Sequence, residues 1–284
     1  MTDGTNAQIK PGKTLLTLEE ILERQQRIKE KGLEGLKENY SLIKDPEIKN
    51  YLDSTEKRKG AVVSVSGGAD STTVVYMLAA LGYEVQGISF DYGQNNSKEV
   101  EYAKHHCALL NIPYLRIDVT DVFNITKKVC ALTSGSENVP RFEDVVGSPE
   151  VPTLVPGRNL IFMAISATTA ESTGMDTIAL GIQAADSSNG YYDVTESWRS
   201  GVQKVLDENR NHPIKILAPI VSITKSEIIR IGLELGLDYQ TTMSCYKGTE
   251  PACGECGECI DNRSAFQRAG LVDDPRIIQK VELA

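Results

Sequence analysis

The sequence has no long apolar run and no excess of basic charge. No stretch approaches the roughly 18 consecutive apolar residues that a membrane span needs. Residues 1–13 are polar and lack the apolar segment of a secretory signal. The net charge is −9, whereas nucleic-acid binding depends on basic patches. We therefore expect a cytoplasmic protein with no membrane partner, and the charge argues against a nucleic-acid partner. A small anionic substrate remains compatible, because it needs only a local positive field.

Cysteine is scarce outside one short segment. The chain has six cysteines. Four of them form the pattern C-x7-C-x2-C-x2-C, namely Cys245, Cys253, Cys256 and Cys259. In a cytoplasmic chain this clustering indicates a metal before a disulfide. Four thiolates suit a closed, tetrahedral and structural zinc site, with one Zn²⁺ per chain. An iron–sulfur cluster is the alternative, but no Cys-Pro follows and the fourth cysteine lies upstream. We expect Cys107 and Cys130 to be ordinary buried thiols.

A glycine turn early in the chain lacks the lysine of a Walker-type phosphate loop. The β-branched run from Val62 to Val65 predicts a buried strand, and a helical pattern follows from Thr72 to Leu81. Glycine lets the backbone approach an anion, and the start of a helix offers N–H groups and positive potential. A phosphate or pyrophosphate site of a nucleotide is therefore predicted. Its residues are Ser66, Gly67, Gly68, Ala69, Asp70, Ser71 and Thr72. The alternative is a Gly-Gly turn capped by Ser66 and Asp70 that binds nothing.

Strand and helix patterns alternate from Gly60 onward. Strands are expected at 61–66, 85–90, 114–118, 177–181 and 214–217, and helices at 70–81, 98–110, 158–173, 196–209 and 225–235. This alternation predicts an α/β fold with a doubly wound, mainly parallel five-stranded sheet and helices on both faces. Ligands bind at the carboxyl ends of the strands in such folds, which is where the glycine turn lies.

Several strings resemble those of one enzyme family. S-G-G-x-D-S at 66–71 resembles the loop of PP-loop ATP pyrophosphatases, which cleave ATP between the α and β phosphates. Other strings are similar to the 7-cyano-7-deazaguanine synthase (QueC) family. They are Phe90-Asp-Tyr-Gly-Gln94, Val155-Pro-Gly-Arg-Asn-Leu160, Ala218-Pro219 with Thr224-Lys225, Ser244-Cys-Tyr246 and the cysteine pattern. The resemblance runs from about residue 60 to 270, and V-P-G-R-N-L with the cysteines is its specific part.

This resemblance implies an ATP-dependent carbon–nitrogen ligase of queuosine biosynthesis. Members of the family convert 7-carboxy-7-deazaguanine to the nitrile with ATP and ammonia. Adenylation activates the carboxylate, ammonia displaces AMP to give an amide, and a second activation dehydrates the amide. The implied partners are ATP with Mg²⁺, ammonia and a deazaguanine carboxylic acid, and a homodimer is expected.

The resemblance also implies roles for single residues. Asp70 would help to bind Mg²⁺, Lys225 would be a second phosphate contact, and Arg158 with Asn159 would face the reaction centre. For Arg158 and Lys225 the alternative is a solvated surface charge. Further candidates are Asp91 and Tyr92 on the nucleotide side, and Asp186, Tyr191 and Asp193 on the substrate side.

One segment departs from the family pattern. The family usually carries Gly-Tyr-Pro-Asp-Cys-Arg where it receives the deazaguanine, but this chain has Gly190-Tyr-Tyr-Asp-Val-Thr195. It also has Asn95-Asn96 where the family usually has Arg-His. Losing a guanidinium fork can change which anion is recognised. An alternative is therefore a diverged ligase that keeps adenylation and joins a deazaguanine acid to another amine, for example on a protein. A tRNA-modifying adenylase of the superfamily and a non-catalytic nucleotide or zinc scaffold are further alternatives.

Three regions follow from these patterns. Residues 1–58 form an N-terminal helical extension, 59–240 a PP-loop ATP-binding α/β domain, and 241–284 a zinc-binding C-terminal region. Thr17 to Glu20 matches a capping box, followed by an apolar helical stripe to about Asn39, and a short helix is expected over 46–52. We favour packing of this extension on the main domain over docking of a partner. Another capping box, Thr224 to Glu227, predicts a helix start near Lys225. Residues 121–156 are a long, poorly periodic loop, typical of a lid or of disorder.

Overall fold

A parallel sheet forms the centre of the molecule. The computed structural model describes residues 16–55, 60–145, 151–184, 190–209 and 211–278. Within these ranges five parallel strands pair in the order β3-β2-β1-β4-β5. Their bounds are β1 (Gly60–Ser64), β2 (Glu84–Asp91), β3 (Tyr114–Asp118), β4 (Thr177–Ala179) and β5 (Lys215–Leu217). The predicted α/β fold with a parallel five-stranded sheet is confirmed. The chain direction across the sheet reverses between β1 and β4, which is where ligands bind in open α/β sheets.

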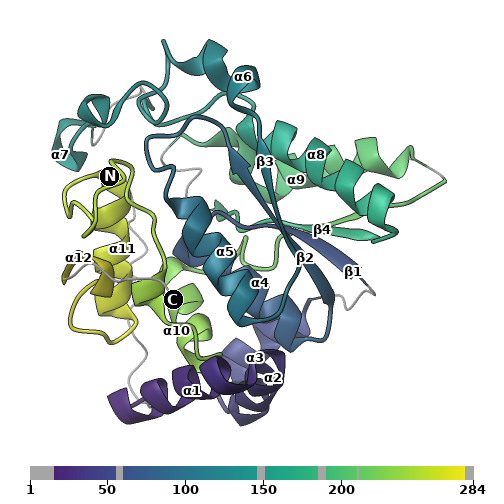
Figure 1. Ribbon diagram of the computed structural model, residues 1–284, viewed down its shortest axis with the longest axis vertical. Helices are drawn as coiled ribbons and strands as arrows, with labels where there is room; N and C mark the ends of the chain where they lie inside the picture. The colour runs from purple at the N-terminus through teal and green to yellow at the C-terminus, as the bar shows by residue number, and fades with distance from the viewer. Residues whose placement is uncertain (1–15, 56–59, 146–150, 185–189, 210, 279–284) are drawn as a thin grey trace.

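Helices cover both faces of the sheet (Figure 1). Helices α4 (Ala69–Ala80) and α5 (Glu99–Leu109) lie on one face, and α8 (Arg158–Thr173) and α9 (Glu196–Asp207) lie on the other. Val62 and Val63 of β1 are fully buried because adjacent strand residues point to opposite, covered faces. α4 is buried nearly all round, since α2 (Leu33–Leu42) and α10 (Lys225–Glu234) cover the side away from the sheet. The predicted strand and helix bounds agree with the observed ones to within about two residues.

The N-terminal helices pack on the main body of the protein. They are α1 (Leu18–Lys31), α2 and α3 (Pro46–Asp53). The capping box is present, because Thr17 Oγ1 accepts from the Glu20 backbone N–H at 3.1 Å and the Glu20 carboxylate accepts from the Thr17 N–H at 2.8 Å. The apolar stripe predicted to run to Asn39 is divided at Gly32, where φ is +57°. Asn39 Nδ2 then donates to the Leu235 carbonyl just after α10, at 3.1 Å.

The remaining described elements are short, apart from one helix near the C-terminus. They are α6 (Thr120–Phe123), η1 (Asn124–Thr126), η2 (Ser136–Asn138), α7 (Phe142–Val145), η4 (Tyr192–Val194), η5 (Tyr239–Thr241), α11 (Gly257–Arg268) and α12 (Pro275–Ile278). The described part of 121–156 therefore holds only brief helical turns, as its poor periodicity predicts. The capping box at Thr224 opens α10. Among the described residues no helix combines the length and apolar character that crossing a membrane requires.

Candidate active site

A cavity of about 790 Å³ opens at the carboxyl end of the sheet, beside the reversal point between β1 and β4. The loop after β1, the ends of β2 and β4, the start of α8 and the first turns of α11 line it, and parts of 132–153 close one side. Several predicted site residues line it together, namely Ser66, Gly68, Asp70, Ser71, Tyr92, Arg158, Asn159 and Tyr191. The fold thus brings the predicted nucleotide residues and reaction-centre residues into one chamber.

Other predicted site residues do not line the cavity. Among the described residues, those outside the lining are Gly67, Ala69, Thr72, Asp91, Asp193, Lys225 and three of the cysteines. Thr72 is fully buried, and Asp91 forms an ion pair with Arg116. Asp193 is buried, and its backbone carbonyl accepts from Asn159 Nδ2 at 3.3 Å. The predicted substrate residue Asp186 lies outside the described residues.

The loop after β1 leads into the N-terminus of α4 at the cavity. Gly67 has φ of +86°, a conformation that favours glycine. Gly68 is the N-cap of α4, so the first N–H groups of that helix point toward the loop. Ser71 Oγ accepts from the Ser66 N–H at 3.0 Å and lies 2.9 Å from Ser66 Oγ. A turn held open in this way, at the start of a 12-residue helix, suits a phosphate group.

Charged side chains from three elements meet at Asp70. Gln183 Nε2 donates to Asp70 Oδ1 at 2.9 Å. Lys225 Nζ at the start of α10 lies 3.8 Å from Asp70 Oδ2 and 2.8 Å from Glu258 Oε1 on α11. Burial raises the pKa of Asp70, and Lys225 opposes that shift. Burial also acts to raise the pKa of Glu258, but Lys225 and Asn262 hold it below its ordinary value. Lys225 is therefore a paired cation next to the glycine loop.

Arg158 lies at an aromatic wall. It opens α8 directly after Gly157, which has φ of +70°. Its Nη1 lies 3.4 Å from the Tyr92 hydroxyl, and its guanidinium is 5.9 Å from the centre of the Tyr92 ring. Burial raises the pKa of Tyr92 to about 12, so this phenol stays neutral. Phe90 and Phe162 stack nearby with their ring centres 4.0 Å apart. This half of the cavity combines flat apolar surface with a fixed cation.

Glu99 is a cavity residue that the sequence patterns did not single out. It is the first residue of α5, and its carboxylate accepts from Gln94 Nε2 at 3.2 Å and from Asn96 Nδ2 at 3.5 Å. Burial raises its pKa to about 8. The cavity residues Glu258 and Asp261 were missed as well, and so was Gln183, which does not line the cavity but donates to Asp70. Glu258 lies between two cysteines of the pattern, and Glu99 follows soon after the string Phe90-Asp-Tyr-Gly-Gln94. Both residues are therefore close in sequence to motifs that could have drawn attention to them. Gln183 had no such motif nearby.

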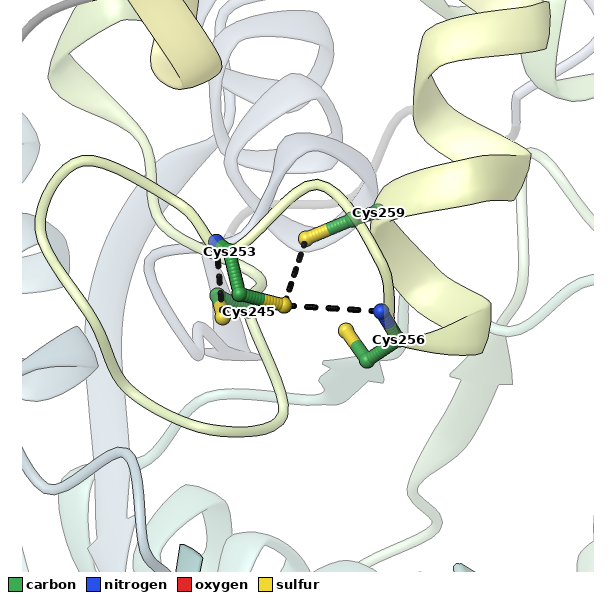
Figure 2. A group of neighbouring side chains, drawn as sticks. All are labelled: Cys245, Cys253, Cys256 and Cys259. Carbon is green, nitrogen blue, oxygen red and sulfur yellow. Dashed lines mark hydrogen bonds between the residues drawn. The ribbon is translucent and has the colours of Figure 1, made fainter. Parts of the chain in front are cut away.

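The four cysteines of the pattern meet beside this cavity. Their Sγ atoms all lie within 4.8 Å of one another. Cys245 and Cys253 are on loops, Cys256 is the N-cap of α11, and Cys259 is in its first turn (Figure 2). The Cys253 and Cys259 sulfurs are 3.9 Å apart. The Cys256 N–H lies 3.4 Å from Cys253 Sγ. A tetrahedral zinc with bonds of about 2.3 Å spaces its sulfurs by roughly 3.8 Å. The four cysteines thus fit a metal, as predicted.

The family model described as queuosine biosynthesis protein QueC matches residues 60–270. The chain belongs to this family. A 7-cyano-7-deazaguanine synthase of Caldicellulosiruptor bescii is 40% identical over 215 residues, covering 75% of this chain and 95% of that protein. The synthase of Thermoplasma acidophilum is 41% identical over 223 residues, covering 76% of this chain and 91% of that protein. For the synthase of Rickettsia akari the identity is 37% over 224 residues, covering 76% of this chain and 97% of that protein.

These matches confirm the predicted family and its enzymatic character. The relatives are named as synthases, and the chain spans nearly their full length. Helices α1 to α3 precede the matched residues, so this part of the chain lies outside the region that the family model describes.

Proposed function

We propose that the protein converts 7-carboxy-7-deazaguanine to 7-cyano-7-deazaguanine with ATP and ammonia. The observation that carries this proposal is the meeting of the glycine loop, Asp70 and Arg158 in one cavity, in a chain of the QueC family. A carboxylate is a poor electrophile, and its oxygen is a poor leaving group. Transfer of AMP to the carboxylate corrects both, and the enzyme must therefore hold ATP and the acid side by side.

In this proposal the loop from Ser66 to Thr72 holds the phosphates of ATP. The Gly68 end of α4 offers backbone N–H groups. Asp70 would contact Mg²⁺, which when bound would neutralise the charge of the leaving pyrophosphate. Lys225, already paired with Glu258, turns toward Asp70 and supplies positive charge behind the loop. The acid lies with its flat ring against the Phe90 and Phe162 wall and its carboxylate toward Arg158.

Zinc has a structural role in this proposal. The four cysteines offer closed tetrahedral ligation, and such sites contribute to folding and not to the reaction. When bound, the metal ties the loop at Cys245 to the start of α11. Glu258, two residues after Cys256, is thereby held against Lys225.

A second candidate is favoured by the segment after Gly190. Tyr191 lines the cavity, Val194 is buried, and the Tyr192 side chain is 54% exposed. Arg158 is the one basic side chain that the described part of the chain brings to the lining. The site that receives the acid thus lacks the second guanidinium that the family pattern supplies. We propose as the alternative that the enzyme forms an amide between a deazaguanine acid and another amine, carried by a protein, and stops there.

Mass analysis of products distinguishes the two candidates. The zinc-loaded protein is incubated with ATP, Mg²⁺, ammonium and 7-carboxy-7-deazaguanine, with a reaction lacking ammonium as the control. We expect the nitrile, with two AMP and two pyrophosphate released for each nitrile. AMP release without nitrile, and amide formation only with an added amine, favours the second candidate. No AMP or pyrophosphate under any of these conditions overturns both.

Assembly and location belong to the same proposal. We expect a cytoplasmic homodimer, and light scattering of the zinc-loaded protein tests the dimer. A mass equal to one chain at all concentrations tested contradicts it.

A further inference from the structure

Glu99 and Asn96 form a polar pocket in the cavity wall that the proposed activation of the acid does not use. Both residues line the cavity. Asn96 is only 6% exposed, and its Nδ2 faces the Glu99 carboxylate at 3.5 Å. Within the described part of the chain, Asn96 Oδ1 is buried and has no hydrogen-bond partner. If the Asn96 side-chain amide were flipped, its oxygen would face the Glu99 carboxylate and two acceptors would meet. The atom without a partner is therefore the amide oxygen, which is a hydrogen-bond acceptor. An acceptor and a carboxylate together require a ligand that donates hydrogen bonds.

The charge of the lining favours a cation at this pocket. Among the described residues that line the cavity, the charged side chains are Arg158 and four carboxylates, namely Asp70, Glu99, Glu258 and Asp261. Glu258 is paired with Lys225, whereas the partners of Glu99 are the neutral amides of Gln94 and Asn96. A concave surface with an excess of negative charge concentrates small cations. Mg²⁺ requires a more complete shell of oxygen ligands than one carboxylate and one amide provide, so it suits this pocket less well than a small cation that donates hydrogen bonds.

The place of Glu99 also suits a nucleophile. Its backbone carbonyl lies against the phosphate loop, since a Cβ on Gly67 would be 2.2 Å from the Glu99 oxygen. On the other side is Arg158, whose charge acts on the carboxylate. The pocket therefore lies between the loop that holds the phosphates and the arginine that faces the acid. In the proposed reaction the bond between the acyl carbon and AMP forms between that loop and Arg158. The same bond is later broken when the amine attacks.

We propose that Glu99 and Asn96 bind the ammonium ion and that Glu99 removes its proton; this rests on the proposed function. The carboxylate takes one proton from NH₄⁺ and releases NH₃. The lone pair of NH₃ attacks the acyl carbon of the adenylate, so a C–N bond forms. The C–O bond to AMP breaks, and AMP leaves with the electron pair. The new C–NH₃⁺ group loses one proton to water and becomes the amide.

The surroundings of Glu99 suit a base that acts near neutral pH. Burial raises its pKa to about 8, and Glu258 from α11 and Asp91 from β2 act in the same direction. Arg158 from α8 and the amide of Gln94 oppose them. Tyr92 stays neutral beside it. A general base works best when its pKa is close to the working pH, because the group is then both ionised and basic enough to accept a proton.

Two nucleophiles test the proposal, because they differ in needing a base. Ammonium must lose a proton before it attacks, whereas hydroxylamine is already neutral at pH 8 and forms a hydroxamate. In Glu99→Gln we expect kcat/KM for ammonium to fall by about 100-fold or more. Hydroxamate formation and ATP-dependent pyrophosphate release should stay at the wild-type rate. Glu101→Gln, an exposed neighbour on α5, is the matched control.

A second variant examines binding separately from proton transfer. Asn96→Ala removes the acceptor and should raise KM for ammonium about tenfold with kcat nearly unchanged, as expected for the loss of one hydrogen bond. The pH profile of kcat/KM for ammonium should lose its rise near pH 8 in Glu99→Gln only.

Three results would overturn the proposal. The first is an equal loss of the ammonium and hydroxylamine reactions in Glu99→Gln. The second is an Asn96→Ala variant in which KM rises for the acid and not for ammonium. The third is a Glu99→Gln variant with unchanged ammonium kinetics while the wild type makes product. If the wild type itself makes no product from ammonium, the proposed function fails, and the inference fails with it.

Discussion

At Gly67 the backbone of the glycine loop lies against α5. Its φ is +86°, and an added Cβ would lie 2.2 Å from the Glu99 carbonyl oxygen. Neither the backbone conformation nor the contact tolerates a larger side chain, because both involve main-chain atoms. Residue identity at this position therefore sets the shape of the whole loop.

Gly67→Ala should abolish ATP binding and lower the stability of the fold. A left-handed alanine costs about 1–2 kcal/mol, and the clash with the carbonyl adds to it. Gly82→Ala is the matched control, since Gly82 has the same φ of +86° but nothing within 4 Å of its Cβ. Calorimetric ATP titration and thermal melts of both variants provide the measurement. Equal ATP affinity in the two variants would show that the loop does not depend on this contact.

Glu99 should make the stability of the protein depend on pH. Its pKa in the folded chain is about 8, against an ordinary value of 4.5, so the folded state binds the proton more tightly. The wild type should therefore lose stability as pH rises from about 4.5 to about 8. Glu99→Gln removes this loss and should be more stable than the wild type at about pH 8, with little difference at about pH 4.5. Urea unfolding of both proteins at both pH values measures this difference. A wild type that is more stable than Glu99→Gln at about pH 8 contradicts the prediction.

At the scale of elements, α11 links the metal ligands to the cavity. Cys256 caps this helix and Cys259 is in its first turn, and between them Glu258 reaches Lys225. Asn262, one turn further along, donates to the same carboxylate at 2.7 Å. The position of Lys225 beside Asp70 thus depends on the start of α11 being fixed.

Removing the metal should weaken ATP binding indirectly, through the loss of the contacts that α11 makes with Lys225. We expect a strong chelator to extract one zinc per chain, to lower Tm and to reduce ATP affinity. Cys256→Ser should do the same, because it removes a fully buried ligand. Cys107→Ala, a buried thiol outside the cluster, should keep its zinc. Zinc analysis and ATP titration measure the result, and unchanged ATP affinity in the zinc-free protein would refute the link.

At the scale of the whole molecule, one apolar core joins the regions that the sequence divides. Ile28, Leu36 and Leu52 from the N-terminal helices belong to the same buried cluster as Val63 of β1 and Phe266 of α11. Arg24 is buried and forms an ion pair with Glu234 at the end of α10. The N-terminal helices therefore contribute to the core and do not only cover it.

Asn39→Ala should destabilise the whole molecule and not only the first helices. Asn39 is fully buried and hydrogen-bonds to Arg27, to the Arg24 carbonyl and to the Leu235 carbonyl. Its loss should cost about 1–3 kcal/mol. We expect a single calorimetric transition in the zinc-loaded protein, shifted to lower temperature in this variant, with exposed Lys37→Ala unshifted. A separate early transition confined to the variant would show that these helices unfold independently.

Local physics allowed much of the fold to be predicted. Buried β-branched runs, capping boxes and helical stripes depend on near neighbours in the chain, and so the strand and helix bounds were close to those observed. The break of the first helix at Gly32 was missed, since its apolar stripe partly continues through Leu33 and Leu36. The segment 121–156 gave no periodic pattern, because its described turns are each only three or four residues long. Contacts between positions far apart in the segment, such as the Ala131 N–H to the Pro152 carbonyl at 2.7 Å, join these turns.

The sequence by itself determined the glycine loop, the cysteine cluster and the alternation of strands and helices, because each is encoded in residues close together along the chain. Only the tertiary structure decided what surrounds them. Gln183 reaches Asp70, and the charge of Arg158 acts on Glu99, because the parallel strands β1 to β4 all end at the same edge of the sheet. Lys225, which follows β5, reaches Glu258 of α11 near that edge. Contacts between residues so far apart in sequence arise from that topology, and they enclose the glycine loop in a cavity of about 790 Å³.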